Sequence, residues 1–183
     1  MLTAKSREPD SCDSEIQNTS SKNLISACGL FCGACGIYQA TQENDIEKIL
    51  QYAVVLNQTF DETLCDGCGA KRKSLHCSKM CTFIDCKQQK GVNFCTDCIE
   101  FPCQALLDFK SEMPHRIEII ESLKRLKEIG QENWINEMEK HFSCPECNAL
   151  NSAYDIKCRK CGKSPGCKFV EEHKEVIEKY LAK

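Results

Sequence analysis

Hydrophobic residues recur every three or four positions in several separate stretches of the chain. The first stretch lies between Gln42 and Leu56, where Asn44 is a suitable N-cap and Glu47 follows three residues later. Its apolar positions share one helical face and are Ile46, Ile49, Leu50, Ala53 and Val54. We therefore predict an amphipathic helix over residues 42–56.

Two further helices are predicted between residues 113 and 141. Met113-Pro114 opens the first, because proline suits the first helical position, and Gly130 suits its C-terminal end. Its apolar stripe is Ile119, Ile120, Leu123 and Leu126. The second runs from Gln131 to about His141 and contributes Trp134, Ile135 and Met138, with Trp134 as a packing anchor.

A closing amphipathic helix is predicted at the C-terminal end. Its periodic positions are Phe169, Val170, His173, Val176, Ile177, Tyr180 and Leu181. His173 is expected to be a core or half-exposed histidine and not a ligand. By contrast, residues 1–23 are polar and without periodicity, so we expect a disordered tail, in which Cys12 has no partner.

Two CxxC pairs near the C-terminus have the spacing of a zinc ribbon. They are Cys144-Pro-Glu-Cys147 and Cys158-Arg-Lys-Cys161, separated by ten residues. Each pair turns the backbone so that two thiolates point to one position, and two pairs complete a tetrahedron around Zn²⁺. We expect a closed structural zinc site there, supported by short β-strands.

Cysteine content changes the expectation for the middle of the chain. The chain has 17 cysteines in 183 residues, a content typical of scaffolds held by cross-links or metals. Eleven fall between residues 28 and 103 and are predicted metal ligands: Cys28, Cys32, Cys35, Cys65, Cys68, Cys77, Cys81, Cys86, Cys95, Cys98 and Cys103. Zn²⁺ and an iron–sulfur cluster both remain open for these cysteines. Residues 65–103 lack alternation, so short helical turns and knuckle loops are expected.

Chain order suggests how the central cysteines group. One set combines Cys28, Cys32 or Cys35 with Cys65 and Cys68. The other combines Cys77, Cys81 and Cys86 with Cys95, Cys98 and Cys103. His76 is a weaker candidate ligand, because the cysteines suffice.

The N-terminal residues lack an apolar secretory segment, and no run of about 18 apolar residues occurs. We therefore expect a cytoplasmic protein with no membrane partner. Thiols are kept reduced in that compartment, and clustered CxxC pairs then indicate metal binding in preference to disulfides.

The formal net charge is −3, which indicates no polyelectrolyte partner by itself. Basic residues nevertheless cluster at 71–90 and 157–168. They fit compensation of thiolate charge better than a nucleic-acid patch, since Phe83 is the one aromatic residue within these two clusters. The expected partner is another protein, and nucleic acid is the less favoured alternative.

The cysteine motifs also resemble a known family. They are the segment 25–35 with Cys28, Cys32 and Cys35, the Cys65-Asp-Gly-Cys68 pair, and the run 90–103. Together with Gly130, Trp134 and the ribbon, they are similar to domain-of-unknown-function family 3795 over about residues 25–165. The resemblance implies a cysteine-rich prokaryotic family, with many members in anaerobic bacteria and archaea and no established activity.

The sequence therefore predicts a small, metal-stabilised, mainly α fold with irregular cysteine-knuckle loops. Its expected parts are the tail 1–23, a cysteine-rich helical metal-binding domain at 24–142, a zinc ribbon at 143–166 and a C-terminal helix at 167–183. The favoured function is a non-catalytic, zinc-binding interaction or regulatory module. An iron–sulfur redox or accessory protein of anaerobic metabolism is one alternative, and an enzyme with an incompletely ligated metal is another.

Overall fold

The computed structural model describes residues 23–183, and the predicted tail with Cys12 lies outside this range. Helical residues make up 57% of the described part, which confirms the mainly α prediction. No β-strand occurs within residues 23–183; the two extended pairings are single bridges, Ile25 with Phe31 and Ser143 with Leu150. The predicted short strands of the ribbon are therefore wrong, because a single bridge closes the first knuckle and side-chain hydrogen bonds link it to the second.

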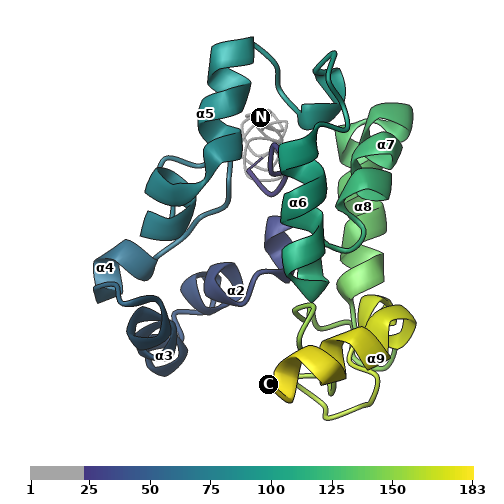
Figure 1. Cartoon of the computed structure of the whole chain (residues 1–183). Helices are drawn as coiled ribbons and strands as arrows, with labels where there is room; N and C mark the ends of the chain where they lie inside the picture. The colour runs from purple at the N-terminus through teal and green to yellow at the C-terminus, as the bar shows by residue number, and fades with distance from the viewer. Residues whose placement is uncertain (1–22) are drawn as a thin grey trace, which may run out of the picture.

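The longer helices alternate with single turns along the chain (Figure 1). The α-helices are α2 (Gly36–Gln42), α3 (Ile46–Leu56), α4 (Phe60–Thr63), α5 (Thr82–Lys90), α6 (Gln104–Glu112), α7 (Ile119–Ile129), α8 (Gln131–Phe142) and α9 (Lys168–Leu181). The single turns are η1 (Cys32–Ala34), η2 (His76–Met80), η3 (Cys95–Asp97) and η4 (Pro114–Arg116).

The helix predicted at 42–56 begins later in the structure, because α3 starts at Ile46 and Gln42 is the last residue of the preceding helix α2. Asn44 adopts a left-handed φ of 52° after α2, so it separates the helices and does not cap the second. Asp45 caps α3, because its carboxylate accepts a hydrogen bond of 3.0 Å from the Lys48 N–H. Of the apolar face, Ile49 and Ala53 are buried. The remaining positions, Ile46, Leu50 and Val54, form an exposed apolar stripe.

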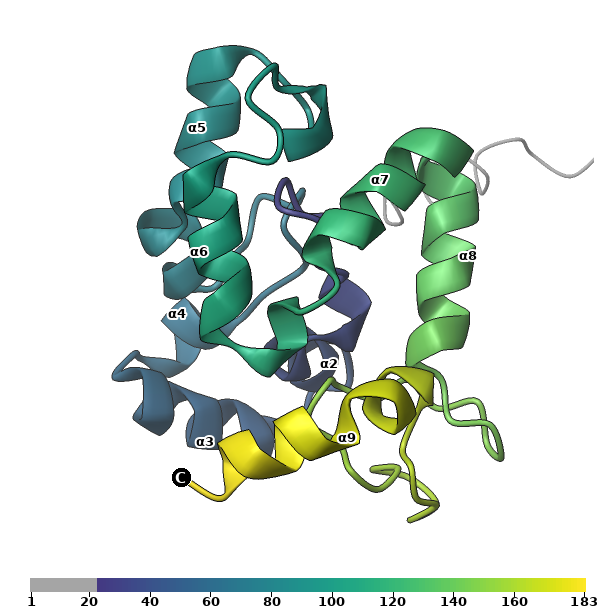
Figure 2. The same cartoon turned by 45° about the vertical axis from the view of Figure 1, so that its right-hand side comes forward.

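Trp134 is at the centre of the hydrophobic core. Its side chain is 0% exposed, and its indole N–H donates a hydrogen bond of 3.0 Å to the Ser122 carbonyl oxygen. Helices α7 and α8 form a hairpin through Gly130, whose φ is 78° (Figure 2). Phe31 packs edge-on against Trp134 with ring centroids 6.0 Å apart, which brings the first cysteine segment onto the hairpin.

The close approach of the first cysteine segment to α7 requires glycine at position 29. A Cβ there would lie 2.6 Å from Leu123 Cγ, and the φ of Gly29 is 88°. The Ser122 hydroxyl also donates to the Gly29 carbonyl oxygen at 3.0 Å. This segment is therefore held against the helical core by packing and hydrogen bonding.

The predicted helix start at Met113-Pro114 is a separate turn in the structure. Pro114 begins η4, and the α-helix α7 begins later, at Ile119. The predicted end at Gly130 and the predicted helix over 131–141 are confirmed.

Helix α9 crosses one end of the α7–α8 hairpin (Figure 2). Phe169 is buried and stacks on Phe142 with ring centroids 5.0 Å apart. His173 interrupts the helix with a φ of −120° and a ψ of 17°. The C-terminal helix therefore shares the core with α8.

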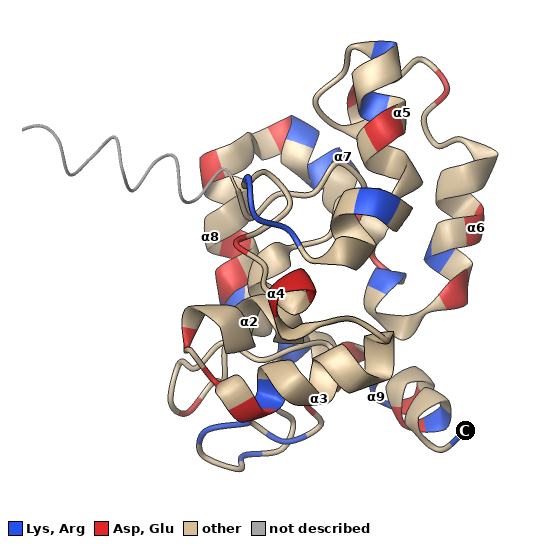
Figure 3. Ribbon diagram, turned by 90° about the vertical axis from the view of Figure 1, so that its left-hand side faces the viewer, with Lys and Arg blue, Asp and Glu red and all other residues tan. Residues whose placement is uncertain are grey.

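None of the helices within residues 23–183 combines the length and apolar character required to cross a bilayer. Acidic and basic segments are interspersed on the face shown in Figure 3.

Replacing Trp134 with alanine should strongly destabilise the protein. The substitution removes the most buried large side chain and leaves a cavity, for which about 3–5 kcal/mol is typical. Urea unfolding followed by circular dichroism measures the free energy of unfolding. Leu181→Ala, at a side chain that is 53% exposed, is the matched control and should change it little.

His115 should make the stability depend on pH. Burial, followed by the charges of Arg116 and His76, lowers the pKa of His115 from 6.5 to about 4. Between these values the unfolded chain binds the proton and the folded chain does not, so stability is lost as pH falls from about 6.5 towards 4.

The test compares melting temperatures at pH 7 and pH 5. His115→Asn should show a smaller drop than the wild type, because asparagine does not titrate. An equal drop in His115→Asn would contradict this assignment.

Candidate metal centre

The two predicted knuckles have the same local structure. In each, the residue four positions after the first cysteine donates its N–H to that cysteine's carbonyl oxygen: Asn148 to Cys144 at 3.0 Å and Gly162 to Cys158 at 2.9 Å. Both donors have left-handed φ, 56° for Asn148 and 76° for Gly162. Repeating the turn places the second thiol of each pair beside the first.

Four sulfur atoms meet where the knuckles face each other. The Sγ atoms of Cys144, Cys147, Cys158 and Cys161 all lie within 4.8 Å of one another. The Cys144–Cys161 and Cys147–Cys158 sulfur pairs are each 3.6 Å apart. A tetrahedral Zn²⁺ with bonds of about 2.3 Å needs sulfurs about 3.8 Å apart. This tetrad therefore fits a single metal ion.

Backbone donors favour a thiolate at Cys158. Burial raises its pKa, but N–H groups of Cys161 and Lys160 outweigh burial and lower the pKa to about 6. The Lys160 nitrogen is 3.4 Å from the Cys158 Sγ, and Glu146 N–H stands at the same distance from the Cys144 Sγ. These donors stabilise negative sulfur, as expected around a metal–thiolate centre.

Neighbouring sulfurs oppose further ionisation. The Lys163 N–H lowers the pKa of Cys161, but burial and the other three thiols together raise it to about 12. Without a cation the four groups therefore do not all become thiolates at neutral pH. A divalent ion would remove that conflict, because metal binding deprotonates cysteine ligands.

Asn151 joins the two knuckles from the inside. Its side chain is fully buried, and its amide donates to the Ala149 and Gly166 carbonyl oxygens at 2.8 and 3.0 Å. Its Oδ1 accepts the Arg159 N–H at 3.0 Å. These bonds replace the predicted strands as the support of the site. Asparagine between two CxxC pairs could have indicated such a link.

Arg159 attaches the second knuckle to the N-terminal helices. Its guanidinium forms two contacts of 2.6 Å with the Glu43 carboxylate and lowers the pKa of that carboxyl. Lys163 pairs with Glu146 at 3.0 Å across the knuckles. These two bases of the 157–168 cluster are therefore paired with carboxylates, where the sequence suggested charge compensation of thiolates.

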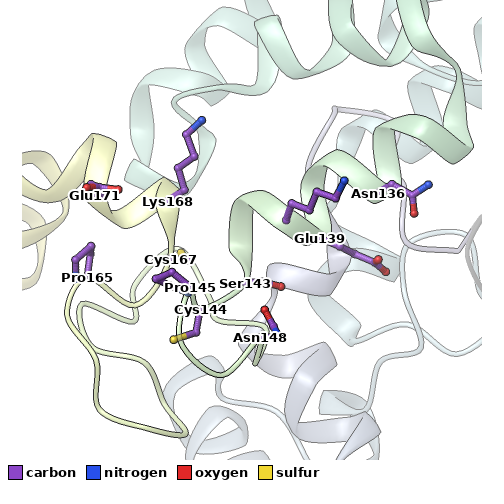
Figure 4. A pocket seen from close by; sticks show the side chains of 11 residues that line it. Asn136, Glu139, Ser143, Cys144, Pro145, Asn148, Pro165, Cys167, Lys168 and Glu171 are labelled. Carbon is purple, nitrogen blue, oxygen red and sulfur yellow. The ribbon is translucent and has the colours of Figure 1, made fainter.

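A groove of about 670 Å³ lies beside the tetrad. Figure 4 shows Asn136 and Glu139 of α8 on one side and Lys168 and Glu171 of α9 on the other, with Cys144 at the loop between them. Acidic and basic side chains both line it. The groove therefore has no charge preference for an anion or a cation.

A hydrogen-bonded cluster that the sequence prediction missed links three helices. Glu118, at the start of α7, lies 3.0 Å from the His141 Nε2 of α8 and 2.6 Å from the His173 Nε2 of α9. Burial opposes ionisation of Glu118, but the two histidines dominate and lower its pKa. Glu172 also approaches Glu118 and His141. Because the members come from three distant segments, their spacing contains no signal.

The first central cysteines gather around η1 and the 65–68 loop. The Cys68 N–H donates to the Cys32 Sγ at 3.2 Å. Burial, then the charge of Cys68, raises the pKa of Cys32, with smaller contributions from Cys35 and Cys65. This agrees with the grouping of Cys32 or Cys35 with Cys65 and Cys68 suggested by chain order.

Cys77 and Cys81 lie nearer to this first set than chain order suggested. Burial raises the pKa of Cys77 to about 12, and the charges acting on it come from Cys65, Cys35 and Cys68. Cys81 in turn acts on Cys28. Chain order had grouped Cys77 and Cys81 with the later cysteines, and that grouping stays a prediction.

The remaining central cysteines line one cavity. It has a volume of about 130 Å³, and its cysteines are Cys86, Cys95, Cys98 and Cys103. Burial is the largest cause that raises the pKa of Cys95 to about 12. The charges of Cys28, Cys103, Cys86 and Cys98 raise it further. Among the 16 cysteines within residues 23–183, all are free thiols. Within that range, His76 joins no cluster of potential metal ligands.

Comparison with known proteins identifies the N-terminal half. No curated protein and no solved structure matched the chain. A family model matched residues 24–108, which contain all eleven central cysteines. The match ends before Gly130, Trp134 and the knuckles, so the wider extent expected from the motifs is not supported. Over residues 24–108 this chain is similar to the family described as "Protein of unknown function (DUF3795)".

Proposed function

We propose that this protein is a non-catalytic, metal-binding interaction module whose C-terminal tetrad binds one structural Zn²⁺. The observation that carries the proposal is the convergence of the Cys144, Cys147, Cys158 and Cys161 sulfurs within 4.8 Å. Four thiolates fill a tetrahedral shell and leave no position for water or substrate. The tetrad therefore suits a role in folding, and not a role as a Lewis acid.

The position of the tetrad supports a structural role. Cys144 and Cys158 are buried, and Cys147 and Cys161 are exposed, so the metal would link the protein interior to the surface loops. Phe142, two residues before Cys144, packs on Phe169 in the core. Metal binding at the knuckles would therefore fix the adjacent ends of α8 and α9.

The exposed stripe of α3 supports the interaction part of the proposal. Ile46, Leu50 and Val54 recur every four residues and are 57%, 49% and 82% exposed. An apolar stripe of this width suits a protein partner better than a nucleic acid. Reduced thiols suit a reducing compartment, and we therefore propose a cytoplasmic location.

Removing a tetrad cysteine should remove the metal. In Cys158→Ser, zinc measured by mass spectrometry should fall by about one equivalent per chain, because three thiolates bind far more weakly than four. The melting temperature should also fall, since structural zinc contributes an apparent binding energy of about 10–16 kcal/mol in isolated finger peptides.

Cys167→Ser is the matched control. Cys167 is also buried and precedes α9, but it is not a member of the tetrad. This variant should keep its zinc. Unchanged zinc content in Cys158→Ser, or equal loss in Cys167→Ser, would contradict the proposed site.

A further inference from the structure

A second set of four cysteines surrounds a cavity on the other side of the α-helical core. Cys86 projects from α5, and Cys103 is the N-cap of α6. Cys95 and Cys98 begin and end the η3 turn between them. All four line the cavity of about 130 Å³. We propose that Cys86, Cys95, Cys98 and Cys103 form a second metal centre, and that it binds an iron–sulfur cluster.

The backbone holds the cysteines around the cavity. The Cys95 N–H donates to the Ala27 carbonyl oxygen at 2.9 Å, which fixes η3 to the first cysteine segment. The Cys98 N–H donates to the Cys95 carbonyl oxygen at 3.2 Å and closes the CxxC turn. The Cys103 carbonyl oxygen accepts the first hydrogen bonds of α6. Helices α5 and α6 are packed together by Phe83 and Phe109, with ring centroids 4.8 Å apart.

The size of the cavity favours an iron–sulfur cluster over a single metal ion. In the C-terminal tetrad, sulfur pairs lie 3.6 Å apart, as one Zn²⁺ requires. Within residues 23–183, the four cysteines of the cavity do not form such a tight group. Their cavity of about 130 Å³ greatly exceeds the roughly 10–15 Å³ that one water-sized probe occupies. Cysteines spread around a space of this size suit a core of several iron atoms and bridging sulfides.

The surroundings of the cavity suit a negatively charged cluster. Phe83 and Leu106 are buried and form an apolar side. Lys87 and Lys90 line another part of the cavity, and Lys90 pairs with Glu100 at 2.7 Å. Four thiolates around an iron–sulfide core carry net negative charge, which nearby lysines offset. The apolar side limits access of water to the core.

The inference is independent of the zinc proposed at the tetrad, and one experiment measures both. The protein is purified without oxygen and then incubated with ferrous iron, sulfide and a thiol reductant. Iron, acid-labile sulfide, zinc and visible absorption are measured. The expected result is about two to four iron atoms, as many sulfides, and broad visible absorption.

Variants locate the cluster. Cys98→Ser and Cys86→Ser should each lose at least about half of the visible absorption and iron, because each removes one of four ligands. Cys35→Ser removes an exposed cysteine outside the cavity and should keep both. Far-UV circular dichroism and zinc content establish that each variant is folded; a variant that loses helicity is replaced by Cys103→Ser.

Three outcomes would overturn the inference. They are a wild-type protein without iron after reconstitution, a second equivalent of zinc that displaces the iron, and cluster loss in Cys35→Ser with retention in Cys98→Ser. A tetrad variant that loses zinc but retains the visible absorption would show that the two centres bind their metals independently. That result would support the inference.

Discussion

Repulsion between neighbouring thiolates is the constraint on which this structure depends. Cys144, Cys147, Cys158 and Cys161 place their sulfurs within 4.8 Å, where burial and mutual charge oppose full ionisation. Backbone N–H groups stabilise the negative charge only in part, at the sulfurs of Cys158 and Cys144. A bound cation would compensate the remaining negative charge. The same constraint applies to the central cysteines, where Cys95 and Cys77 are held protonated by burial and by nearby sulfur.

The hydrophobic core and the cysteine clusters are formed mainly by different parts of the chain. The buried core is built mainly by α7, α8 and α9 around Trp134, Leu123 and Phe169. From the long cysteine-rich stretch, few apolar residues reach this core; Cys28, Phe31 and Phe83 are among them. The cysteine segments lie against the helical core through Gly29 and Ser122, and against each other through hydrogen bonds. Side-chain burial stabilises the half of the molecule built by α7, α8 and α9. In the cysteine-rich half, coordination of a metal by the thiols would supply the stabilisation that burial does not.

Much of the fold was predictable where the signal is local. The helices ending at Gly130 and beginning at Gln131 follow from periodicity, and the convergence of the tetrad follows from two CxxC turns. The prediction of β-strands at the two knuckles was wrong because the Asn151 side chain supplies the hydrogen bonds that a strand ladder would have made. The exposure of Ile46, Leu50 and Val54 on α3 could not be predicted, because periodicity marks an apolar stripe but does not say what covers it. The division of the central cysteines and the Glu118 cluster depend on contacts between distant segments, for which chain order contains no information.

The tetrad is joined to the rest of the molecule without a linker. Phe142 on one side and Cys167 on the other belong to the same buried cluster as Trp134, and Arg159 reaches Glu43 beyond α2. Local fraying of the knuckles would therefore expose part of the common interior. If the tetrad binds a cation as proposed, binding and global unfolding are thermodynamically linked, and the folded fraction of the whole chain should rise with the free concentration of that cation.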